Sequence, residues 1–467
     1  MKQLILTLPI FLVFLDHLVV VRAEWEPPSE IPYEEIVKTS QRVLSMPDIP
    51  MKAEEDIFRI QVAEMDWDVG GMVYHPLDSS RIPVGPNGRK VGIFMLHGGT
   101  RDHRFLDPVA RLLTGKFGYK VVTMSFPGRI YLHDPSRDWP GDTMKPDGSL
   151  RTPIFKEGLV IAKDQYEVVE DQSMRPKYGT VILACANEET EFYHRMAAYP
   201  MAFEEAGKAM MRRHFPEEEY SIYIHGHSAG GPWAFMFTQR VENIAGVVGM
   251  ETSPFGAIYR IQSRPSGNPY GKTQGELPFN CLKVHNWRVV AMYKGSEALM
   301  REGPEALMRL PMLMEEVLEE WEQVKHYAQF NADNPVHHGG IVQLAKSAQA
   351  VAKRMNFSSE ETEELVEHFV GYVREMRGPN VKSVPPVILG MAEASAGHEH
   401  ETYRRITLPM FAGMDPPPKV RLVPFRVGTH YYFEREEDLP LGPFPAVAKL
   451  WHDAIMNGYY LDNTPDF

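Results

Sequence analysis

Short apolar runs alternate with amphipathic stretches through the first half of the chain. Four near-continuous apolar runs have the pattern of strands buried on both faces of a parallel sheet: residues 91–96, 119–124, 220–225 and 244–250. Residues 105–117 and 191–214 carry apolar side chains at helical spacing, although Pro200 is expected to kink or split the second helix. Strands that alternate with helices build βαβ units, so the pattern predicts an α/β fold around a mostly parallel sheet.

A hairpin is expected ahead of this alternation. Residues 57–63 and 70–74 have the pattern of two strands, and the polar residues 66–68 between them predict the turn. Residues 33–44 carry a helical pattern before the hairpin. The sheet is therefore expected to begin with a helix and an antiparallel strand pair.

The alternation of strands and helices stops at about residue 259, and a mostly helical segment follows. Residues 341–355 and 359–376 predict amphipathic helices, and the second begins with a Ser-Ser-Glu-Glu sequence suited to capping. The sequence thus predicts a helical insertion at residues 259–378 between two parts of one core.

The sheet pattern resumes towards the end of the chain. Residues 384–390 and 420–427 predict two further strands, and Pro424 favours an edge position for the second. Residues 444–459 predict a closing helix. The two parts of the core are accordingly residues 24–258 and 379–467.

The first 23 residues resemble a secretory signal peptide. Lys2 supplies the positive end, residues 4–15 are the apolar segment, and Val21-Arg22-Ala23 suits a cleavage site. Asp16 and His17 interrupt the apolar run, so it makes a poor membrane span, and an uncleaved signal anchor is the alternative. We expect a secreted or periplasmic protein with no membrane span after cleavage, in which Asn356 lies in a glycosylation sequon.

Charge and cysteine content restrict the partners. The 467 residues carry a formal net charge of −13, which argues against nucleic acid or an anionic membrane surface as a partner. Cys185 and Cys281 are the only cysteines, and one disulfide and a buried free thiol both stay open for them. No Cys and His spacing suggests zinc, and we expect neither a metal nor a cofactor.

The segment Gly226-His227-Ser228-Ala229-Gly230 carries the strongest chemical signal. It follows one of the apolar runs, and a helical pattern continues from Gly231 onwards. A strand, a tight turn and a helix are the context of a nucleophile elbow, in which small residues flank a serine whose hydroxyl is exposed above the sheet. The N–H group of Ala229 is then available at the start of the helix.

A second segment, His97-Gly98-Gly99-Thr100, leaves the run at residues 91–96. With the elbow, this segment makes the sequence resemble the α/β-hydrolase superfamily, in particular serine esterases and lipase-like proteins with a helical cap. The resemblance implies helices on both faces of the sheet and a cap inserted after the sixth strand. It implies an oxyanion hole formed by Gly99 and Ala229. It also implies four substrate-binding residues: His97, Gly98, Thr100 and His227.

The same resemblance places the catalytic base after the last strand. A serine hydroxyl needs a neutral imidazole within hydrogen-bond reach, and an acid must fix the tautomer of that imidazole. His430 lies in the Gly-Thr-His turn that follows residues 420–427, and it is the predicted base. His452 lies inside the closing helix, beside Trp451, where a structural histidine is expected.

Two carboxylates compete for the role of the acid. Glu393 follows the apolar run at residues 387–392, and Asp415 follows residues 408–414. Parallel strands need a crossover of about a dozen residues, which fits between Glu393 and Val420 but not between Asp415 and Val420. We therefore predict Glu393 as the acid and keep Asp415 as the alternative.

These residues together predict a secreted serine hydrolase that cleaves a carboxylic ester, with a medium-sized lipophilic ester as the expected small-molecule substrate. Ser228, His430 and the acid would act through an acyl-enzyme intermediate. Thioesterase, amidase and carbon–carbon hydrolase chemistry fit the same residues. A non-catalytic binding protein with this fold is the alternative from another class. The sequence leaves the oligomeric state open.

Overall fold

The computed structural model describes twelve stretches of the chain, and every structural statement below concerns these residues. They are residues 31–98, 102–130, 154–171, 181–228, 230–252, 279–284, 335–375, 383–392, 403, 408–412, 416–427 and 437–456.

An eight-stranded sheet forms the centre of the molecule. Its spatial order is β1-β2-β4-β3-β7-β8-β10-β11. The first two pairings in this order are antiparallel and the remaining five are parallel. The strands are β1 (Met51–Val62), β2 (Met65–Pro76), β3 (Lys90–Leu96), β4 (Lys120–Met124), β7 (Tyr220–His227), β8 (Ile244–Met250), β10 (Val387–Ala392) and β11 (Val420–Phe425). The predicted mostly parallel α/β sheet is therefore confirmed.

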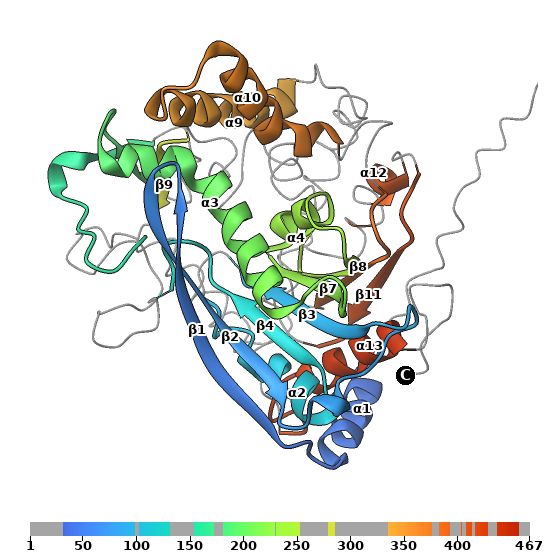
Figure 1. Ribbon diagram of the computed structural model, residues 1–467. Helices are drawn as coiled ribbons and strands as arrows, with labels where there is room; N and C mark the ends of the chain where they lie inside the picture. Colours follow the sequence, from blue (N-terminus) through green and yellow to red (C-terminus); the bar gives the residue numbers. More distant parts are fainter. Residues whose placement is uncertain are drawn as a thin grey trace, which may run out of the picture.

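Helices cover both faces of this sheet. One face carries α3 (Glu191–His214) and α4 (Gly230–Thr238). The other carries α1 (Tyr33–Ser45), α2 (Asp107–Phe117) and α13 (Phe444–Met456), and the two layers lie on opposite sides of the strands in Figure 1. Two short 3₁₀ turns, Ser79–Arg81 and Lys163–Gln165, complete the connections before α3.

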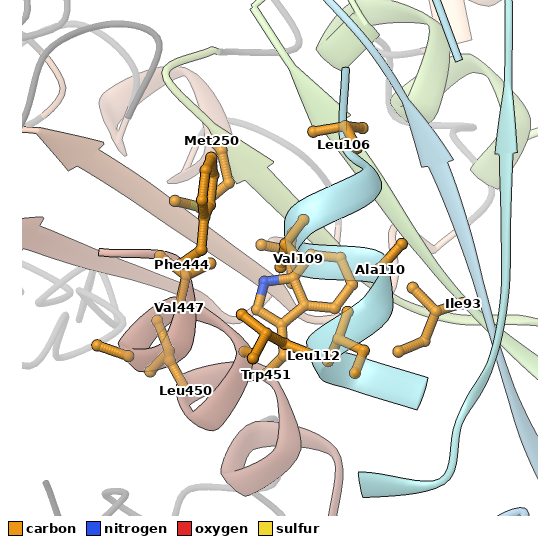
Figure 2. Close-up of a cluster of buried hydrophobic side chains, with 14 of the residues drawn as sticks. Ile93, Leu106, Val109, Ala110, Leu112, Met250, Phe444, Val447, Leu450 and Trp451 are labelled. Atoms are coloured by element: carbon orange, nitrogen blue, oxygen red, sulfur yellow. The ribbon is translucent and has the colours of Figure 1, made fainter. Parts of the chain in front are cut away.

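The alternation of side chains along each strand divides the core into two layers. In β3, the side chain of Phe94 packs in the layer that contains α3 and α4. The side chains of Ile93 and Met95 pack in the opposite layer, which contains α2 and α13. Figure 2 shows the second layer, in which Trp451 of α13 lies against the side chains of α2. A central strand must be apolar throughout because both of its faces are covered, which explains the unbroken apolar run.

The predicted hairpin forms, but its turn lies elsewhere. The turn consists of Ala63 and Glu64, whose φ values of 51° and 59° suit a two-residue hairpin, and not of residues 66–68. Asp68 lies within β2 opposite Arg59, and the Arg59 Nε donates to its carboxylate at 2.7 Å. Asp68, which suggested a turn, is thus one half of a charged pair across two strands.

Pro200 does not split the helix that contains it. α3 runs without interruption over 24 residues, with Pro200 inside it. Phe203 is fully buried and stacks on Trp233 of α4 with ring centroids 4.0 Å apart. Packing of this kind offsets the backbone hydrogen bond that a proline removes.

A second, three-stranded sheet lies outside the main one. It has the order β5-β6-β9, formed by β5 (Tyr166–Asp171), β6 (Val181–Ala186) and β9 (Cys281–Val284). A disulfide joins Cys185 and Cys281, which face each other across β6 and β9. This settles the open question of the two cysteines. It also places a strand inside the segment expected to be helical, and that strand pairs with β6 of the preceding segment.

The two predicted helices of the insertion are confirmed as α9 (Pro335–Arg354) and α10 (Ser359–Glu375). Ser358 and Glu361 form the expected reciprocal cap at the start of α10. α9 packs on α3, and the Ser347 hydroxyl donates to the Ala197 carbonyl. Figure 1 shows both helices beyond α3, away from the main sheet. The domain boundaries at residues 258 and 378 stay predictions.

We expect Trp451→Ala to lower the free energy of unfolding by about 3–5 kcal/mol, because it removes a large, fully buried side chain from the layer in Figure 2. Urea unfolding followed by circular dichroism measures the change. Leu77→Ala is the control, since Leu77 is 66% exposed and its loss should change stability by about 0.5 kcal/mol or less. Equal effects of the two substitutions would contradict this description of the core.

Candidate active site

The turn after β7 holds Ser228 in an unusual backbone conformation. Its φ is 50°, in the left-handed region that residues other than glycine rarely adopt. The Ser228 N–H donates to the Met250 carbonyl at 3.0 Å, and the Gly231 N–H donates to the Ser228 carbonyl at 3.1 Å. Strain of this kind persists where the surroundings enforce it, and such positions cluster at functional sites. Ser228 is half-buried and leads directly from β7 towards α4.

The glycines on either side of Ser228 are required by close backbone contacts. A Cβ atom on Gly226 would lie 2.5 Å from the Cα of Gly231. A Cβ atom on Gly230 would lie 2.7 Å from the carbonyl oxygen of His97. The expectation that only small residues fit two positions before and two after the serine is therefore confirmed. The second contact also brings the end of β3 against this turn.

Gly98 brings the end of β3 directly beside Ser228. A Cβ atom on Gly98 would lie 3.3 Å from the Cβ of Ser228 and 2.7 Å from the Nδ1 of His227. Four of the predicted site residues are thus adjacent in space: His97, Gly98, His227 and Ser228. Gly99, Thr100 and Ala229 lie outside the described residues.

His97 is a buried, neutral residue that fixes the backbone of this segment. Its Nε2 accepts a hydrogen bond from the Phe126 N–H at 3.0 Å, so we assign the ring proton to Nδ1, which lies 2.6 Å from the Gly98 carbonyl oxygen. The ring stacks on Phe126 with centroids 4.0 Å apart. Burial lowers the pKa of His97 well below its usual value. Substrate contact by His97 and by the equally buried His227 stays a prediction.

A buried Ser–His–carboxylate chain, which sequence reasoning missed, anchors the segment that follows residues 99–101. The fully buried His103 places Nδ1 2.6 Å from the Ser125 hydroxyl and Nε2 3.0 Å from the Glu55 carboxylate. The His103 N–H donates to the same hydroxyl at 2.9 Å. Burial lowers the pKa of His103. Ser125 is 1% exposed, so the chain joins the loops after β3 and β4 to the middle of β1 instead of presenting a nucleophile.

No local sequence signal marks this chain. Glu55, His103 and Ser125 lie far apart in the sequence, and each belongs to an ordinary polar stretch. Only the parallel pairing of β3 with β4 brings His103 and Ser125 to the same edge of the sheet.

Glu251 lies in the turn after residues 244–250, which the sequence suggested only as a lining of the pocket, with no catalytic role. It follows β8 and is completely buried, and its φ is 56°. Its carboxylate accepts a hydrogen bond from the Ala392 N–H at the end of β10, and its own N–H donates to the Gly390 carbonyl at 2.9 Å. A carboxylate thus lies between the ends of two parallel strands beside the Ser228 turn.

The predicted base and both candidate acids lie outside the described residues, but the strands before them are described. β10 ends at Ala392, directly before Glu393, and β11 ends at Phe425, a few residues before His430. Residues Leu408–Ala412 form the short helix α12, so Asp415 does not follow a strand. β11 is an edge strand, as Pro424 suggested.

His452 has the structural surroundings expected for it. It lies in α13, and its ring stacks on Phe117 with centroids 4.5 Å apart. The Tyr119 hydroxyl is 3.0 Å from its Nδ1. Burial lowers the pKa of His452. It packs in the α2 and α13 layer, where these contacts account for the residue.

Neither a metal site nor a membrane span is found in the part of the chain that the structure describes. No group of three His, Cys, Asp or Glu side chains there is arranged to hold a metal ion. Among the described helices, none combines the length and the apolar character needed to cross a bilayer.

The strand order of the sheet and the strained serine between β7 and α4 define an α/β-hydrolase fold. No protein-family model and no curated protein matches the sequence. Among solved structures, the chain is similar to a Pyrococcus horikoshii acylaminoacyl peptidase at 11% identity, with a TM-score of 0.34 over 86% of this chain and 41% of that one. The chain therefore spans less than half the length of that peptidase.

Two further solved structures match over most of both chains. A haloalkane dehalogenase variant from Bradyrhizobium elkanii is 9% identical, with a TM-score of 0.36 over 88% of this chain and 100% of that one. An epoxide hydrolase from Vigna radiata is 11% identical, with a TM-score of 0.37 over 86% and 98%. At these levels of similarity, the fold assignment rests on the strand order and on the turn at Ser228.

We expect Gly230→Ala to destabilise the protein by about 1–3 kcal/mol, because the new methyl group would meet the backbone of β3. Gly115→Ala is the matched control. Its methyl group would meet only the Met51 sulfur at 3.5 Å, and removing a helical glycine should leave stability unchanged or raise it by about 0.5–1 kcal/mol. Urea unfolding of both variants tests this, and equal stabilities would contradict the close contact between the turn and β3.

Proposed function

We propose that this protein is a serine hydrolase that cleaves a carboxylic ester, with Ser228 as the nucleophile. The observation that carries the proposal is the strained, half-buried serine at the end of a central strand, with the Gly98 backbone beside it. A serine held in a left-handed turn between a strand and a helix is the arrangement that exposes a nucleophile in this fold.

In the proposed reaction, His430 takes the proton of Ser228 as the hydroxyl attacks the ester carbonyl. The tetrahedral oxyanion accepts hydrogen bonds from the N–H groups of Gly99 and Ala229, and each such donor is worth about 3 kcal/mol in comparable sites. His430 then protonates the leaving alcohol. The same imidazole activates a water molecule that releases the acid from the acyl-enzyme.

The contacts of His97 support this oxyanion hole. His97 fixes the direction of the Gly98 carbonyl, directly before the proposed donor Gly99 in the sequence. Burial lowers the pKa of His97 well below its usual value, which favours the neutral ring that makes this contact. His97 acts through the backbone in this proposal and is a positioning residue.

We also propose that the protein is exported and acts on medium-sized lipophilic esters. The disulfide between Cys185 and Cys281 supports export, because such bonds persist in oxidising compartments. The methionine-rich stretch at residues 297–329, which lies outside the described residues, supports a lipophilic substrate.

We expect Ser228→Ala to lower the turnover of nitrophenyl esters about 10⁴-fold or more, because the nucleophile is lost. Labelling by a fluorophosphonate probe should fall from one group per chain to none. Ser125→Ala is the matched control, since Ser125 belongs to the buried chain with His103 and should keep full labelling.

Rising acyl length in the ester series measures the size of the site. Labelling of the parent without turnover of any ester would redirect the proposal to thioesters, amides or carbon–carbon bonds. Absence of both would favour the binding-protein alternative, and loss of labelling in Ser125→Ala alone would move the nucleophile to Ser125.

A further inference from the structure

We propose that Glu251 is the carboxylate that orients the catalytic imidazole, in place of Glu393 or Asp415. This inference rests on the proposed serine hydrolase function and names a positioning residue that the sequence pattern did not reveal.

The first argument is position, because the residues on both sides of Glu251 bind the backbone of the nucleophile. The Met250 carbonyl accepts the N–H of Ser228 at 3.0 Å, and the Thr252 hydroxyl donates to the Ser228 carbonyl. The Tyr403 hydroxyl in turn donates to the Thr252 carbonyl at 2.6 Å. Glu251 is therefore fixed relative to Ser228 by its two neighbours in the chain, Met250 and Thr252.

The second argument is the placement of a charged group in a buried site. Glu251 is completely buried, and its carboxylate accepts the N–H of Ala392. An N–H donor favours the ionised form of a carboxyl group, and burial alone opposes it. A carboxylate accepts several donors at once, and the imidazolium that forms during hydrolysis is the cation that such a group stabilises.

The third argument is backbone strain. Ala63 and Glu64 have positive φ values because they make the hairpin turn, and Glu189 and Asn356 are exposed turn residues shortly before helices. Glu251, with a φ of 56°, is instead completely buried at the end of a central strand. A glutamate held in this conformation inside the protein is costly, which favours a functional role.

Topology allows this carboxylate to serve the predicted base. β8, β10 and β11 are parallel neighbours, so their carboxyl ends lie along one edge of the sheet. His430 follows β11 in the sequence, and the Glu251 carboxylate already extends from β8 to the last residue of β10. Glu393 comes directly after the N–H group that Glu251 holds, and Asp415 follows the helix α12.

The test compares Glu251→Gln with Glu393→Gln and Asp415→Asn in the full-length protein. Glutamine keeps an oxygen that can accept the Ala392 N–H, so it removes the charge and keeps the tie between β8 and β10. The readout is the second-order rate constant for fluorophosphonate labelling of Ser228, measured across pH, with thermal unfolding of each variant as the check on folding.

We expect Glu251→Gln to slow labelling by a factor on the order of 10²–10⁴, by comparison with loss of the acid in other triads. The midpoint of the acid limb should also move down by about one pH unit or more, because a neighbouring carboxylate raises the pKa of an imidazole and its removal lowers that pKa. Glu393→Gln and Asp415→Asn should stay within about threefold of the parent with unshifted midpoints. A purely structural Glu251 would lower the rate without moving the midpoint.

The inference is overturned by an unshifted midpoint in folded Glu251→Gln, or by a slowed and shifted profile in either control variant. If Glu251→Gln does not fold, the two control variants decide. Unchanged labelling rates and pH midpoints in both variants support Glu251. A slower rate with a shifted midpoint in either variant rejects it. A parent that is not labelled, or a Ser228→Ala variant that is, rejects the proposed function itself and the role of Glu251 with it.

Discussion

The contact between the turn after β7 and the end of β3 is the constraint on which the rest of the site depends. The two strands pair in parallel along their full length, and their last paired residues are Leu96 and Gly226. Beyond that point the backbones stay so close that a methyl group on Gly230 would meet the His97 carbonyl. The sheet therefore positions Ser228 through main-chain contacts, which are harder to disturb than contacts between side chains.

Buried polar groups below the site fix the ends of the strands. His97 joins the end of β3 to the start of the loop after β4. His103, in the loop between β3 and α2, binds Ser125 after β4 and Glu55 of β1. Glu251 does the same for β8 and β10. Such groups are costly to bury unless they are hydrogen-bonded. Their concentration at one edge of the sheet is most simply explained by the need for a rigid framework around Ser228.

The sequence predicted the sheet because its central strands are apolar on both faces, and it predicted the serine turn because glycine spacing is a local signal. It misplaced the hairpin turn because Asp68 pairs with Arg59 across the strands, a contact between residues distant along the chain. The same limit applies to the His103 chain and to Glu251. A buried carboxylate is recognised only when the partner strand that supplies its N–H donor is known. The proposal of Glu251 over Glu393 and Asp415 rests on such a contact, the hydrogen bond from the Ala392 N–H.

The disulfide between β6 and β9 encloses a large part of the chain in one covalent ring. Cys185 and Cys281 are 96 positions apart, and α3, the Ser228 turn and β8 all lie between them. A single cut by a protease anywhere in this interval leaves both fragments attached to each other as long as the bond is oxidised. In a protease-rich environment, the ring would allow the nucleophile and its supporting strands to remain in one molecule after a nick.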